Sequence, residues 1–270
     1  MDKILYRCIV TLLAMVVMVG CSSDETINMS KGLSVGVSVE GWNEVGGTRA
    51  TYSPIQESSG KKVFKASFNT GDKIGVFLCD KNGKVVIANM KFTYDGSKWN
   101  TDTPFEYFAG LGNHLFFAYY PYQESLQGAV AVGDTPDVSS ADTFFSGSVG
   151  LWTPAGDQGS LEKFTSQDLM ISKGDVSMPY FQEVNVSFSM SHKMGLLITK
   201  KSLDYYNIDD PSDTWSEVQD FSGNIPYELD GLCYFFAKPN VSTTLGSKTT
   251  KVEPGQVEQL YFSGGEPSNR

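Results

Sequence analysis

The sequence has few of the side chains that most enzymes and metal sites use. It contains 2 His and 4 Cys among 270 residues, and the two His are widely separated. His192 falls in the apolar phase of an alternating stretch, which predicts a hydrogen-bonded core histidine in preference to a ligand or a base. His114 has no Cys or carboxylate cluster at ligand spacing. We therefore expect no metal site, no cofactor and no enzymatic activity.

Three partial motifs do not change this expectation. Ser146–Gly150 misses the nucleophile-elbow pattern, because its first position is Ser where that pattern has Gly. Gly110-Leu111-Gly112 lacks the third Gly and the following helix of a dinucleotide-binding turn. The acidic residues at 209, 210 and 213 do not have EF-hand spacing, so a solvated loop is favoured over a calcium site.

Basic residues are also scarce. The chain has 21 Lys and Arg against 31 Asp and Glu, which gives a formal net charge of −10. Nucleic acids and anionic membrane surfaces repel such a charge. We expect no nucleic-acid partner.

The N-terminus carries the pattern of an export signal. Lys3 and Arg7 precede an apolar run from Ile9 to Val19, which is shorter than the ~20 residues of a membrane-spanning helix. Met18-Val19-Gly20-Cys21 then resembles the lipobox of bacterial lipoproteins, in which the cysteine is acylated and the chain is cut before it. The sequence predicts a signal peptide over 1–20 and a lipid anchor at Cys21, attached stably by two or three acyl chains. The alternative is an ordinary signal peptide with an incidental Cys.

The residues after Cys21 bear on where the anchor lies. Ser22 to Glu25 form a short acidic run that resembles the surface-export signal of lipoproteins from some anaerobic Gram-negative bacteria. A solvated tether has the same composition. We expect the outer membrane, with the cell surface favoured over the periplasmic face.

Two cysteines remain, Cys79 and Cys233. They could pair in an oxidising compartment. Each lies in an apolar strand-like run, however, so buried free thiols are favoured.

The body of the chain has the composition of an all-β protein. Aromatic residues make up 13%, there are 27 Gly, and no long helical pattern occurs. Residues 31–40 alternate, with Leu33, Val35, Val37 and Val39 on one face, which predicts a half-buried first strand. Residues 41–49 show no such pattern, and Gly46-Gly47 should leave them mobile. Arg49-Ala50 then lies in an expected exposed loop, where a proteolytic cut would detach the first strand.

The remaining strands divide into two groups. Strands follow from Lys62, with Asn82-Gly83 predicting a type I′ hairpin turn, an aromatic strand at 114–122, long loops over 123–165 and a short strand at 168–171. Val184 to Lys200 alternates in one phase and is expected as a single long strand that opens a second sheet. We therefore place one domain over 50–181 and another over 182–270, behind a segment of tether and first strand at 21–49.

Five segments together resemble the Mfa-like fimbrillin family. These are Phe68–Phe77, Phe92–Trp99, Phe116–Tyr122, Asp168–Met170 and Phe188–Leu196. Each is weak alone, but their order and spacing behind a lipobox and Thr48-Arg49-Ala50 are specific. The resemblance covers about residues 45–200 and fades after Lys200.

The resemblance implies a fold and a mechanism of assembly. The fold would be two tandem transthyretin-like β-sandwich domains, the second short or incomplete because only seventy residues follow Lys200. A trypsin-like or gingipain-type protease would cut after Arg49 and release the strand from Leu33 to Val39. The exposed groove would then accept an extended segment from another fimbrial subunit, either a copy or a paralogue, by strand addition.

Two functions therefore stand against each other. The first is a structural or adhesive subunit of a cell-surface fimbria, in a stalk, tip or anchor position that the residues leave open. The alternative is a surface lipoprotein that never polymerises and binds glycans or host ligands through exposed aromatic residues. Candidates for the latter are Phe105, Tyr107, Phe108, Tyr119, Tyr120 and Tyr122, although alternation predicts that about half of the 116–122 group is core.

Overall fold

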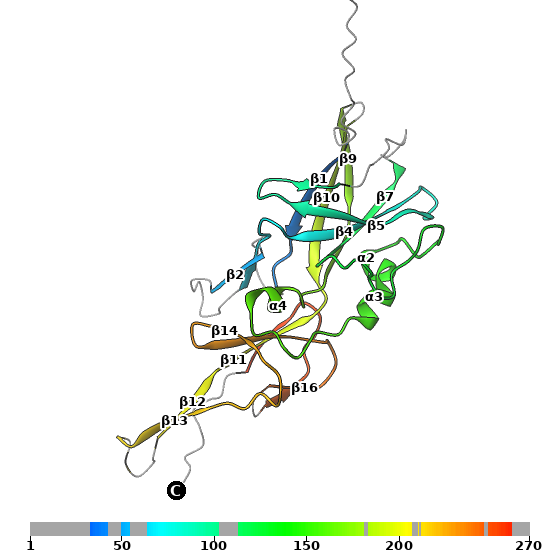
Figure 1. The fold of residues 1–270 in the computed structure, drawn as a ribbon. Coiled ribbons are helices and arrows are strands. Elements are labelled where there is room, and N and C mark those ends of the chain that lie inside the picture. The colour runs from blue at the N-terminus through cyan, green and yellow to red at the C-terminus, as the bar shows by residue number, and fades with distance from the viewer. Residues whose placement is uncertain are drawn as a thin grey trace, which may run out of the picture.

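The structure is a computed structural model that describes residues 33–42, 50–54, 64–102, 113–180, 183–206, 210, 212–245 and 248–260. Strands dominate this part of the chain, and Figure 1 shows them as two groups that follow one another along the long axis of the molecule. The prediction of an all-β protein built from sandwich-like sheets is confirmed. No helix among the described residues combines the length and apolarity needed to cross a membrane.

The larger sheet has eight strands in the order β1-β10-β8-β7-β4-β5-β6, with β9 paired to β10. The expected strands at 31–40, 114–122 and 168–171 correspond to three of its members. The bounds are β1 Leu33–Val39, β4 Lys73–Cys79, β5 Val85–Tyr94, β6 Trp99–Asn100, β7 Leu115–Tyr120, β8 Met170–Lys173, β9 Asp175–Tyr180 and β10 Glu183–His192.

This sheet folds over its own core. β10 pairs with β1 from Val184 to Met190 and with β9 from Glu183 to Ser187, and at Ser191 and His192 it pairs with β8. The inward side chains of β1 and β10 therefore face those of β4, β5 and β7 across one cluster. Its buried members are Val35, Val39, Ile74, Val76, Leu78, Met90, Phe92, Trp99, Phe116, Ala118, Tyr120, Met170, Val184, Val186, Phe188 and Met190. The first group is thus a sandwich, and β1 belongs to its core.

The β4–β5 hairpin forms where the sequence predicts it, but with a different turn. Gly83 has φ +85°, whereas a positive φ is not found at Asn82, so the type I′ prediction is wrong. The N–H of Gly83 donates to the carbonyl of Asp80, and the Asp80 carboxylate accepts from the N–H groups of Asn82 and Lys84. A side chain that caps the loop in this way stabilises a turn that needs only one left-handed residue.

The expectation of a single strand from Val184 to Lys200 is wrong. The chain leaves the sheet at Lys193 and Met194, and β11 (Gly195–Lys200) begins a different sheet with the order β14-β15-β11-β18. The other three strands are β14 Tyr227–Leu229, β15 Leu232–Ala237 and β18 Val257–Leu260. Because β10 pairs with β1, β8 and β9, the change from one sheet to the other falls at Lys193-Met194 and not at residue 182. The alternation continues through the break, so periodicity alone does not reveal it.

Three two-stranded ribbons complete the strands. They are β2 (Ala50–Pro54) with β3 (Phe64–Ala66), β12 (Ser202–Tyr206) with β13 (Thr214–Val218), and β16 (Thr243–Leu245) with β17 (Lys248–Thr250). The β12–β13 ribbon lies at the far end of the second group in Figure 1.

The sequence predicted loops over residues 123–165. The structure corrects this, because the stretch contains three short helices. These are α2 (Ala141–Phe144), α3 (Ser146–Leu151) and α4 (Leu161–Thr165). Ser140 and Ser160 cap α2 and α4 through their hydroxyl groups. Helices this short are held by tertiary packing, and their periodic pattern is too brief to be recognised in a sequence.

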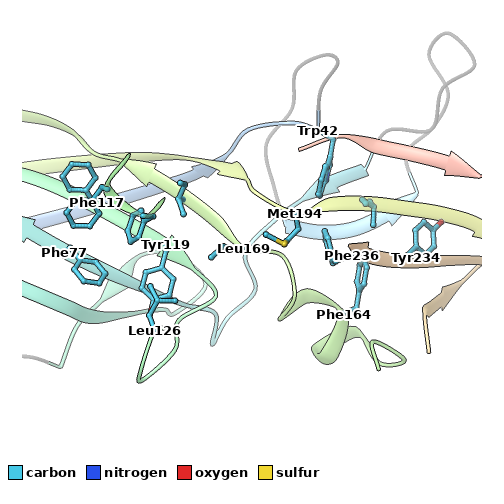
Figure 2. Packing of buried hydrophobic residues seen from close by; sticks show 14 of the residues in the cluster. Trp42, Phe77, Phe117, Tyr119, Leu126, Phe164, Leu169, Met194, Tyr234 and Phe236 are labelled. Atoms are coloured by element: carbon cyan, nitrogen blue, oxygen red, sulfur yellow. The ribbon is translucent and has the colours of Figure 1, made fainter. Parts of the chain in front are cut away.

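A second cluster joins the two groups of strands. Phe77, Phe117 and Tyr119 come from the outer face of the first sheet, where the ring of Phe144 from α2 stacks on Phe117 with centroids 4.0 Å apart. Leu196, Ile198, Tyr234 and Phe236 come from β11 and β15, and Leu169 and Met194 lie between the two sets. Figure 2 shows this continuity. The two sheets therefore share one hydrophobic core across their junction.

Candidate functional site

The first strand lies at an edge of the larger sheet. Among the described strands, β1 pairs with β10 alone, and it runs parallel to it from Leu33 opposite Val184 to Val39 opposite Met190. The partners are separated by most of the first group in sequence but lie side by side in Figure 1. An edge strand can leave a sheet without breaking the ladders among the other strands.

The apolar face of β1 packs into the core of the first sandwich. Val35 and Val39 are 8% and 3% exposed, and Leu33 and Val37 are partly buried against the same cluster. Between them Ser34, Gly36 and Ser38 are exposed. The four aliphatic positions therefore share one face, as the alternation predicted. Whether the strand detaches stays a prediction.

The contact with β10 continues beyond the end of β1. The N–H of Glu40 donates to the carbonyl of Met190, with N and O 2.7 Å apart. Two residues later the Trp42 side chain enters the second cluster and is 3% exposed. Its ring lies 3.8 Å from that of His192 and 5.8 Å from that of Phe236, centroid to centroid, and both pairs are stacked. Trp42 thus touches both groups of strands.

The sequence did not single out Trp42. Residues 41–49 lack alternation, and no pattern of period two includes a tryptophan that follows the strand by three residues. The available signal was a lone large aromatic residue among small and polar ones, a residue type that globular proteins seldom leave fully exposed.

His192 is a core histidine, as predicted. Its Nδ1 lies 2.9 Å from both carboxylate oxygens of Asp168, and the two side chains are 2% and 0% exposed. Asp168 lies just before the buried Leu169 and strand β8, and β8 pairs with the end of β10 at His192, which brings the carboxylate to the imidazole. No pattern in the sequence pairs these two residues, because their contact depends on the meeting of β8 and β10.

The other predicted positions fall in three places. Cys21 and Arg49 lie outside the described residues, and Ala50 is the first residue of β2. Cys79 and Cys233 are both free and buried, as favoured. Burial, with a smaller contribution from a neighbouring carboxylate in each case, raises the pKa of each thiol to about 11.

In the described part of the chain, the remaining partial motifs do not form a catalytic or metal-binding site. Ser146–Gly150 lies within α3, which is not the strand-to-helix turn that a nucleophile elbow needs. Asp210 accepts hydrogen bonds from the N–H and hydroxyl of Ser212, as in a solvated turn. No group of three or more potential metal ligands occurs among the described residues.

The aromatic residues of β7 are largely core. Tyr119 and Tyr120 are buried, and Tyr122 is half-buried. The hydroxyl of Tyr119 donates within the protein, where the Asn89 amide oxygen and the Gln123 carbonyl lie 2.8 and 2.9 Å away. Residues 105, 107 and 108 lie outside the described residues. The described part of the aromatic group therefore offers little surface on which a sugar could stack.

Comparison with known proteins agrees with this architecture. A family model described as fimbrillin-like matches residues 48–224. A protein named "Putative fimbrium tip subunit Fim1C", from Bacteroides ovatus (strain ATCC 8483), is 32% identical over 139 residues, which are 51% of this chain and 24% of that protein.

Two solved structures are among the similar proteins, and the first of them shows likeness in fold. A fimbrial protein from Bacteroides ovatus ATCC 8483 has a TM-score of 0.58 and 22% identity, covering 87% of this chain and 49% of the other. A "putative cell adhesion protein" from the same organism has a TM-score of 0.44 and 16% identity, covering 85% of this chain and 90% of the other.

The chain spans about a quarter of the curated relative and about half of the first solved structure. The family match itself covers more than half of this chain and includes the predicted processing position, most of the first sandwich and the start of the second group of strands. The resemblance to Mfa-like fimbrillins is therefore confirmed, and the chain belongs to the fimbrillin-like family.

Proposed function

We propose that the protein is a structural or adhesive subunit of a cell-surface fimbria, exported as an outer-membrane lipoprotein and assembled by protease-triggered strand exchange. The observation that carries this proposal is the position of β1. It is an edge strand, its Val35 and Val39 side chains lie in the core, and it precedes Arg49 in the chain. A cut after Arg49 separates β1 covalently from every strand that packs on it.

The consequence of that cut follows from burial. Loss of β1 uncovers the inward residues of β10 (Val184, Val186, Phe188 and Met190), which are all at most 1% exposed when β1 is in place. Full burial of one such side chain is worth ~1.5–3 kcal/mol. The open edge also presents unpaired N–H and C=O groups of β10, which an extended segment of another subunit can pair. The partners are accordingly other fimbrial subunits, either copies or paralogues, and the protease is trypsin-like or gingipain-type.

The sequence makes the cleavage test unusually clean. Arg49 is the one arginine between Cys21 and the C-terminal Arg270, so an arginine-specific protease has a single internal site in the 21–270 protein. We expect mass spectrometry to find a cut after Arg49, and size-exclusion chromatography to show release of the 21–49 fragment followed by higher oligomers. The matched control is Arg49→Lys, which keeps the charge but resists that protease and stays monomeric.

A chain that resists cutting, or one that is cut and stays a stable monomer, would overturn the proposal. Either result would favour a surface lipoprotein that does not polymerise.

Lipid attachment is tested separately. Cells that express the full chain in the presence of a labelled fatty acid should incorporate the label into the protein. Cys21→Ser should remove it, because the thiol that forms the thioether to the lipid is gone, while Cys79→Ser keeps it. Labelling that persists in Cys21→Ser contradicts the assignment of the anchor.

A further inference from the structure

In the described part of the N-terminal segment, β1 is followed by a second group that packs into the folded chain, the side chain of Trp42. Trp42 follows Val39 by three residues and lies against His192 of β10 and Phe236 of β15. We call the place that Trp42 occupies against those two rings the aromatic slot. Figure 2 shows Trp42 entering beside Met194 and Phe236, where the two groups of strands meet. A cut after Arg49 therefore frees both β1 and the occupant of the slot.

The walls of the slot are held by groups other than Trp42. The imidazole of His192 is fixed by its hydrogen bond to Asp168, at 2.9 Å from both carboxylate oxygens. The backbone of Phe236 is clamped by the buried Gln158, which accepts from its N–H at 2.8 Å and donates to its carbonyl at 2.9 Å. The Phe236 ring also stacks on Phe164, with 4.6 Å between centroids. His192 and Phe236 therefore keep these contacts when Trp42 leaves the slot.

Stacking and burial hold Trp42 in the slot. Among the described residues, neither its Nε1 nor the Nε2 of His192 has a hydrogen-bond partner. Stacked aromatic pairs contribute about 0.5–1.5 kcal/mol beyond the area they bury. The slot therefore selects a flat apolar ring, without demanding the indole N–H. A small side chain in place of Trp42 leaves a void beside the rings of His192 and Phe236, which lose their packing contacts there.

We propose that the segment which replaces β1 carries an aromatic residue three positions after the aliphatic residue that takes the place of Val39. This ring fills the aromatic slot and stacks on His192 and Phe236, as Trp42 does. The proposal rests on strand exchange at β10. The occupant is an extended segment of another subunit that runs parallel to β10. Its aliphatic residues alternate over seven positions, as in β1, and its ring follows. The slot fixes register, because a slip of one residue moves the ring out of it and turns the aliphatic face outward.

The test uses peptides, so that no substitution can disturb the folding of the protein. The 21–270 protein is cut with the arginine-specific protease in the presence of excess fluorescein-labelled peptide with the sequence of residues 33–42, LSVGVSVEGW. Capture is followed by fluorescence anisotropy. Three further peptides carry Trp42→Ala, Trp42→Phe or Ser34→Ala. The last is the matched control, because Ser34 is exposed in β1.

We expect Trp42→Ala to weaken capture at least about tenfold. Trp42→Phe should stay within about threefold of the parent peptide, and Ser34→Ala should be unchanged. Equal capture of the parent and the Trp42→Ala peptide overturns the slot proposal and leaves strand exchange standing. Failure to capture any of the peptides after a complete cut overturns strand exchange, and the slot proposal with it.

Discussion

The structure predicts how substitutions in β1 weaken the packing of this strand against the core. Val35 and Val39 are both buried in the first sandwich. Truncation of either to Ala removes two carbons from the core, at about 0.8 kcal/mol per CH₂, so each variant should lose about 1.6 kcal/mol plus any cavity term. The two sites are ~13 Å apart along the strand. Their effects should therefore add to about 3 kcal/mol in the double variant.

Aspartate at the same positions should behave differently. A buried carboxylate costs more than a lost methyl group. Because β1 pairs with β10 alone among the described strands, the chain can avoid that cost by releasing β1 as a unit. The loss in Val39→Asp is then limited by the free energy with which β1 docks. Val35→Asp in addition should cost almost nothing more, so the Ala pair is additive and the Asp pair is not.

Urea unfolding followed by tryptophan fluorescence measures these losses, and cleavage at Arg49 by the arginine-specific protease measures release of the strand. Ser34→Asp is the matched control, because it places the same charge on the exposed face of β1. It should leave both readouts near those of the parent. Two outcomes would refute the reasoning. One is a loss in the Asp double variant close to the sum of the singles. The other is unchanged stability and unchanged protease sensitivity in both Asp variants.

Three further predictions concern the core that supports this site. A Cβ at Gly75 would lie 2.1 Å from the Tyr119 ring, so Gly75→Ala should lose about 1–3 kcal/mol, whereas Gly150→Ala, with open space around it in α3, should gain up to about 1 kcal/mol. Thermal denaturation compares them, and equal midpoints contradict the packing argument. The fully buried side chain of Gln158 makes three hydrogen bonds to backbone groups, so Gln158→Ala should lose about 1–3 kcal/mol in urea titration. A loss under about 0.5 kcal/mol means that water replaces the amide. Because burial raises the pKa of Cys79 to about 11, its thiol stays protonated at pH 8 and should react with iodoacetamide only slowly until the pH approaches that pKa or urea unfolds the chain. Rapid alkylation of the native protein at pH 8 contradicts this environment.

The turn at 81–84 illustrates what short-range sequence can and cannot specify. The Asn-Gly pair predicted a reversal at this place, and the hairpin is there. The backbone type was wrong, because the Asp80 carboxylate accepts two N–H groups and stabilises a loop with one left-handed residue. The Asn-Gly pair thus located the turn, and the side chain of Asp80, just outside the pair, decided its backbone conformation.

The single strand expected over Val184–Lys200 failed for a different reason. An alternation with period two shows which side chains share a face of the strand. It does not show which sheet the strand joins. Lys193 and Met194 keep the phase while the chain passes from β10, beside β1, to β11, between β15 and β18. Only packing against both sheets reveals the break.

By itself, the sequence determined the features that depend on neighbours along the chain. These are the strand at 33–39 with its aliphatic face, the scarcity of catalytic side chains, the N-terminal signal pattern and the family segments. The tertiary structure alone decided that β1 runs parallel to β10, that Asp168 fixes His192, and that Trp42 joins the two groups of strands. Each of these contacts joins residues from separate elements. They arise when distant apolar faces are buried together, and no local period records which faces will meet.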